Sequence, residues 1–99
     1  MDINFQFNHS LLSIVELRSF VIRTTKQLEE SFYDPYSNAI EVTEKGDSKP
    51  VYVSYGFSDS MLPIKLTFSL REDIVVTSGA SVISREEVRK YYCGRAKKN

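Results

Sequence analysis

The chain has few of the residues on which metal binding, disulfide bonding and histidine catalysis depend. Among 99 residues it has one cysteine, one histidine and no tryptophan. Most zinc sites and most histidine-based mechanisms need more such side chains than this. Cys93 has no second cysteine in the chain with which to pair, so we expect a reducing, cytoplasmic setting. The composition thus predicts neither a metal nor a cofactor.

Glycine, proline, net charge and long apolar runs are also scarce. Four glycines, three prolines and 41% hydrophobic residues exclude collagen-like and low-complexity classes. Thirteen basic residues balance thirteen acidic ones, so no overall field indicates a polyanionic partner. The start lacks a basic segment, and Glu16 and Arg18 interrupt the most apolar run, residues 11–22. We therefore expect no secretory signal and no membrane contact.

The length predicts one domain, residues 1–99, with a disordered basic tail at 95–99. Residues 3–8 alternate between apolar and polar side chains, which is typical of a strand. Ser10 follows as a helix N-cap, and apolar residues at helical spacing predict a long helix over 11–33. Asp34-Pro35 should end that helix, because the residue before proline is disfavoured in the helical region.

The middle of the chain changes to a period of two. Residues 40–43 and 51–57 predict a hairpin with its turn at Gly46-Asp47, and Tyr52 is expected on the solvated face. Residues 64–71 alternate most clearly, with Ile64, Leu66, Phe68 and Leu70 on the face predicted to be buried. A short strand at 74–77 and a loop at 78–81 complete this part.

The last element has the sequence of a capped helix. Ser84 and Glu87 fit a capping box, while Ile83 and Val88 occupy the positions of a hydrophobic staple. The helix should end near Cys93. Together these patterns predict an α+β, two-layer domain, with a mainly antiparallel sheet of three to five strands packed on a long N-terminal helix and a short C-terminal helix.

No arrangement typical of catalysis is present. The carboxylates of Glu72-Asp73 and Glu86-Glu87 are neighbours whose side chains diverge, so adjacency gives no shared acid–base site. Cys93 has no activating partner nearby in the sequence, and His9 is distant from it. Residues 78–81 lack the glycines and the lysine of a phosphate-binding loop. We expect no catalytic residue and no enzymatic activity.

Charge is unevenly distributed along the chain. Residues 1–60 contain five basic and nine acidic side chains, whereas residues 61–99 contain eight and four. The basic side chains of the last helix and tail accompany two tyrosines, a mixture that nucleic-acid binders also use. The candidate nucleic-acid-binding residues are Arg85, Arg89, Lys90, Arg95, Lys97 and Lys98.

The loop at residues 56–63 contains apolar residues among turn formers, so it either covers the core or contacts a partner. The candidate partner-binding residues are Tyr52, Phe57, Met61 and Leu62. The leading hypothesis is a small, cytosolic, non-enzymatic protein-interaction module, such as an inhibitor, adaptor, immunity-type protein or chaperone. Its partner would be another protein or a second copy paired through a strand edge. The alternative is a small nucleic-acid-binding regulator that uses the basic C-terminal helix and tail.

Overall fold

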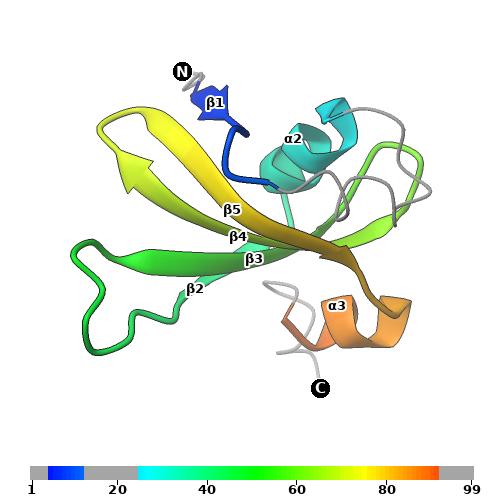
Figure 1. Cartoon of the computed structure of the whole chain (residues 1–99). Coiled ribbons are helices and arrows are strands. Elements are labelled where there is room, and N and C mark those ends of the chain that lie inside the picture. The colour runs from blue at the N-terminus through cyan, green and yellow to red at the C-terminus, as the bar shows by residue number, and fades with distance from the viewer. Residues whose placement is uncertain (1–4, 13–24, 92–99) are drawn as a thin grey trace.

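The computed structural model describes residues 5–12 and 25–91, which form a small α+β fold (Figure 1). Five strands make one mixed sheet in the order β1-β5-β4-β3-β2, in which β1 runs parallel to β5 and the other pairs are antiparallel. The elements are β1 (Gln6–Asn8), α2 (Lys26–Tyr33), β2 (Asn38–Glu41), β3 (Val51–Phe57), β4 (Pro63–Arg71), β5 (Ile74–Val82) and α3 (Arg85–Tyr91). The α+β class and the sheet predicted from the sequence are confirmed.

The central strand β4 buries the face that its alternation predicts. Ile64 and Leu66 are fully buried and Phe68 is 3% exposed. They belong to one core cluster with Leu28 of α2 and Val75 of β5. Leu70, at the far end of the strand, is 37% exposed. Figure 1 shows α2 on one face of the sheet, and the apolar side chains of β4 hold it there.

Strand β3 is buried on both of its faces. The prediction that one face of this strand is solvated is therefore wrong. Val53, Tyr55 and Phe57 form a second core cluster with Val88 of α3. This cluster lies on the opposite side of the sheet from α2 (Figure 1), so the predicted two-layer arrangement is wrong, because helices cover both faces. Tyr52 faces the α2 side instead, where its ring stacks on Phe68 at a centroid distance of 5.6 Å. Tyr52 was expected on the solvated face, but register with Phe68 places it against the core.

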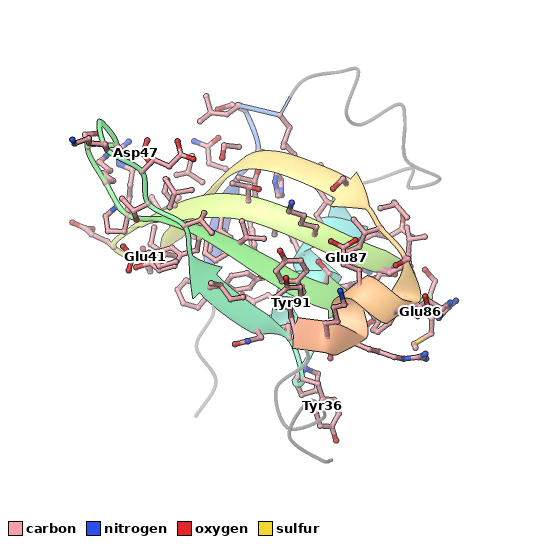
Figure 2. All side chains as sticks on the ribbon, turned by 90° about the horizontal axis from the view of Figure 1, so that it is seen from below. Tyr36, Glu41, Asp47, Glu86, Glu87 and Tyr91 are labelled. Atoms are coloured by element: carbon pink, nitrogen blue, oxygen red, sulfur yellow. The ribbon has the colours of Figure 1, made fainter. Side chains whose placement is uncertain are left out.

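Helix α3 is positioned by the cap and the staple that the sequence predicts. The Glu87 N–H donates to Ser84 Oγ at 3.1 Å, and Val88 is fully buried. The Tyr91 ring stacks on Tyr55 at 4.1 Å. Figure 2 shows Tyr91 and Glu87 over the strands and Glu86 on the outer side of the helix. Burial raises the pKa of Tyr55 above 10.0, and nearby Tyr91 and Glu87 raise it further.

The long helix predicted over 11–33 is wrong, because the described helix is α2, Lys26–Tyr33. The structure places Ser10 in a turn, where its N–H donates to Asn8 Oδ1 at 2.9 Å. The Leu12 N–H donates to His9 O at 3.0 Å. These local hydrogen bonds compete with helix initiation at Ser10. Residues 13–24 of the expected helix lie outside the described residues.

Strand β5 is longer than the sequence suggests, since the loop expected at 78–81 continues the strand to Val82. Its pairing with β4 shifts by one residue between Thr67 and Phe68, so Ser78 is the additional residue of a bulge. Ser78 and the adjacent Gly79 resemble turn formers in the sequence, but such residues also mark bulges inside strands.

Helix α2 ends at Tyr33, directly before Asp34-Pro35, as predicted. Its last turn lies close to β3 at Gly56. A Cβ atom added to Gly56 would overlap the carbonyl oxygen of Ser31 and would lie 3.0 Å from the Ser37 Cβ atom. Only glycine permits this close approach between helix and strand.

Candidate functional site

The connection between β3 and β4, residues 58–62, is a tightly hydrogen-bonded turn. The Ser58 N–H donates to Leu62 O at 3.0 Å, and the Met61 N–H donates to Ser58 O at 2.8 Å. The Leu62 N–H donates to Ser58 Oγ at 3.1 Å, and Ser58 is 3% exposed. These bonds hold Met61 at a φ of 69° with its side chain 49% exposed. A large apolar side chain is thus presented to solvent from a constrained position.

Helix α2 lies beside this turn and is tied to it. Two hydrogen bonds join the helix to the turn: Gln27 Nε2 donates to Ser60 Oγ at 3.2 Å, and the Asp59 N–H donates to Glu30 Oε1 at 3.0 Å. A third joins Asp34, directly after the helix, to the end of β3, where the Phe57 N–H donates to Asp34 Oδ2 at 2.8 Å. Gln27 and Glu30 are three residues apart, so they lie on the same side of α2. The helix and the turn therefore form the two walls of a preorganised groove.

The groove has a volume of about 540 Å³ and mixed walls. Its large apolar or aromatic residues are Tyr33, Pro35, Phe57 and Met61. Its polar residues are Lys26, Glu29, Glu30, Asp34, Ser58 and Asp59. Apolar surface combined with placed polar groups is typical of a binding site. A second hollow of about 650 Å³, lined by Asn8, Lys49, Leu70, Arg71, Glu72, Ile74 and Val76, lies at the other end of the sheet.

Glu29 connects the groove to β5 through the histidine. His9 Nε2 lies 2.9 Å from Glu29 Oε2, and His9 Nδ1 lies 2.7 Å from Thr77 Oγ1. The Thr77 hydroxyl also donates to Asn8 O at 3.3 Å. A carboxylate, an imidazole and a hydroxyl in sequence resemble a nucleophilic triad, but Thr77 is fully buried. The network therefore ties α2 to the sheet and gives a substrate no access to its hydroxyl group.

The four partner-binding residues predicted from the sequence lie in three environments. Met61 and Phe57 line the groove, but Phe57 is 5% exposed and belongs to the core beneath α3. Leu62 packs against the core cluster on the α2 side. Tyr52 stacks on Phe68 at some distance along β3. Of this set, Met61 offers a large apolar surface to a partner at the groove.

The predicted basic surface is partly described. Arg85, Arg89 and Lys90 are exposed on α3, and the Arg85 guanidinium carbon lies 5.8 Å above the Phe57 ring. Glu86 and Glu87 share this helix, so its five charged side chains nearly balance. The other three candidates, Arg95, Lys97 and Lys98, lie outside the described residues.

The sequence prediction missed the acidic wall of the groove. Glu30, Asp34 and Asp59 meet there because α2 and the turn at 58–62 lie side by side, although they are far apart in the chain. The excess of acidic residues in the first 60 positions was the available signal. This excess did not show where the acidic residues meet, because spacing along the chain does not show which loop covers which helix.

Within residues 5–12 and 25–91, no group of three or more histidine, cysteine or acidic side chains could hold a metal ion. No helix in the same ranges is both long and apolar enough to cross a membrane. No protein-family model matches the chain, and a search of curated proteins also gives no match.

Proposed function

We propose that the protein is a small, non-enzymatic interaction module that binds a partner protein in the groove between α2 and residues 58–62. The observation that carries the proposal is the turn itself, which holds the exposed Met61 side chain beside a hollow with hydrogen-bonded walls. An exposed apolar anchor on a rigid support loses little entropy when it is buried by a partner. A cytosolic inhibitor, adaptor, immunity-type protein or chaperone would act in this way.

Two positions with similar backbone geometry provide a matched test. Met61 has a φ of 69°, and Glu72, in the turn between β4 and β5, has a φ of 60°. Glycine tolerates both conformations, so Met61→Gly and Glu72→Gly should each stay within about 1 kcal/mol of the parent stability. Only Met61→Gly removes an apolar side chain from the groove.

The test is quantitative capture from an extract of the native cells, with and without nuclease treatment. We expect a protein that is retained by the parent chain and by Glu72→Gly, and that binds Met61→Gly about tenfold less well. Equal retention by both variants would remove Met61 and its groove from the interaction. Loss of retention after nuclease treatment would favour the nucleic-acid alternative.

The second candidate function uses the outer side of α3. Arg85, Arg89 and Lys90 supply three exposed positive charges, and this supports binding to phosphates. Glu86 and Glu87 on the same helix oppose it. The groove, with its exposed Met61 side chain and hydrogen-bonded walls, supports protein binding better.

A further inference from the structure

The walls of the groove carry an excess of negative charge. Glu29, Glu30, Asp34 and Asp59 line it, and among the described residues Lys26 is the one basic residue that does. An acidic wall around an apolar floor attracts a ligand that is positively charged at one end and apolar along its length. Charge complementarity therefore restricts the kind of residue that a partner can insert.

The hydrogen bonds show which carboxylates can take a new donor. Glu29 already contacts His9 at 2.9 Å, and each oxygen of Asp34 accepts a backbone N–H. Glu30 accepts the Asp59 N–H through Oε1 at 3.0 Å. Within the described residues, no hydrogen bond or ion pair occupies Glu30 Oε2 or the Asp59 carboxylate. The open acceptors thus belong to neighbouring groups on opposite walls of the groove.

We infer that this groove accepts an arginine side chain of the partner protein, with its guanidinium group between Glu30 and Asp59 and its stem along Met61. The inference rests on the proposed function and specifies the chemistry of the ligand. A guanidinium group has five N–H donors in a planar fork, so it can bond two carboxylates at once. Its methylene stem packs on apolar surface while the charged end stays at the acidic rim.

The test uses the full chain labelled with ¹⁵N and two peptides that differ in one group. The first is acetyl-Ser-Leu-Arg-Leu-Ser-amide, and the second has citrulline, which is nearly isosteric and uncharged, in place of arginine. The Asp59 and Phe57 amides report directly, because they donate to Glu30 and Asp34. We expect saturable shifts of these amides with a Kd on the order of a millimolar for the arginine peptide. The citrulline peptide should bind about tenfold more weakly.

The variant Glu30→Gln/Asp59→Asn keeps the shapes of both side chains and should weaken the arginine peptide about five- to tenfold. Glu86→Gln/Asp47→Asn makes the same chemical change at two residues that do not line the groove, and should leave the affinity unchanged. Equal affinity for the two peptides would overturn the arginine inference, and so would shifts confined to α3 or the absence of shifts. None of these results bears on whether Met61→Gly loses the captured protein. The capture experiment therefore tests the proposed function separately from the arginine inference.

Discussion

Replacing Gly56 with alanine should loosen α2 from the sheet. The added methyl group would overlap the Ser31 carbonyl oxygen, and it would lie 3.0 Å from the Ser37 Cβ atom and 3.3 Å from the Asp34 Cβ atom. The oxygen belongs to the helix backbone and cannot rotate away, so the end of α2 must move. That movement disturbs the Asp34 N–H bond to Ser31 O and the Phe57 N–H bond to Asp34 Oδ2.

The cost follows from three contributions. Overpacking costs about 1–3 kcal/mol, and each weakened hydrogen bond costs up to about 1 kcal/mol. Alanine returns about 0.4–1 kcal/mol by restricting the unfolded chain. We therefore expect Gly56→Ala to lower the free energy of unfolding by roughly 1–4 kcal/mol. For a domain of this size the Tm should fall by roughly 5–25 °C.

The assay is urea unfolding at 25 °C together with thermal unfolding, both followed by far-UV circular dichroism. Gly46→Ala is the control, because Gly46 has a φ of 99° and no heavy atom lies within 4 Å of its added Cβ. It should cost only the backbone strain, about 1–2 kcal/mol. A Gly56→Ala variant within about 0.5 kcal/mol of the parent would refute the close packing of α2 on β3.

Four further substitutions test other parts of the structure. Ser54→Ala should raise the free energy of unfolding by about 1 kcal/mol in urea titrations, because Ser54 Oγ is buried without a partner among the described residues. Ser31→Ala should instead lower the free energy of unfolding, because it removes the hydrogen bond from Ser31 Oγ to Leu28 O. Ser84→Ala should cost about 1 kcal/mol in the same titrations by removing the α3 cap, and a neutral result would contradict the cap. Because the Tyr55 pKa is raised in the folded state, its contribution to stability is complete below pH 10 and is lost as the pH rises above that value. Tyr55→Phe should therefore lose less stability than the parent as the pH rises above 10 in unfolding titrations, and an identical decline would exclude this cause.

Local patterns predicted the parts of the fold that depend on local chemistry. The alternation of β4 placed Ile64, Leu66 and Phe68 in the core, and Ser84 begins a capped helix. The errors arose where distant contacts decide. Tyr52 faces the core because of its register with Phe68, and residues 78–81 extend β5 because a bulge accommodates them. Helix α3 covers the second face of β3, which alternation in β4 alone does not indicate.

The candidate site was predicted only in part for the same reason. Met61 could be identified from the sequence, since it is an apolar residue among turn formers. Its acidic neighbours Glu30 and Asp34 come from a helix that the chain brings back to the turn. These residues line the groove together with Met61 only because of tertiary contacts, and such contacts have no signature in spacing or composition.

Amide hydrogen exchange with the captured partner tests the central claim most directly. Adding the partner to the full chain should slow exchange in α2 and at residues 58–62, and leave the outer turns of α3 unchanged. Slower exchange confined to α3, or along the edge strand β2, would place the interface elsewhere and contradict the groove as the binding site.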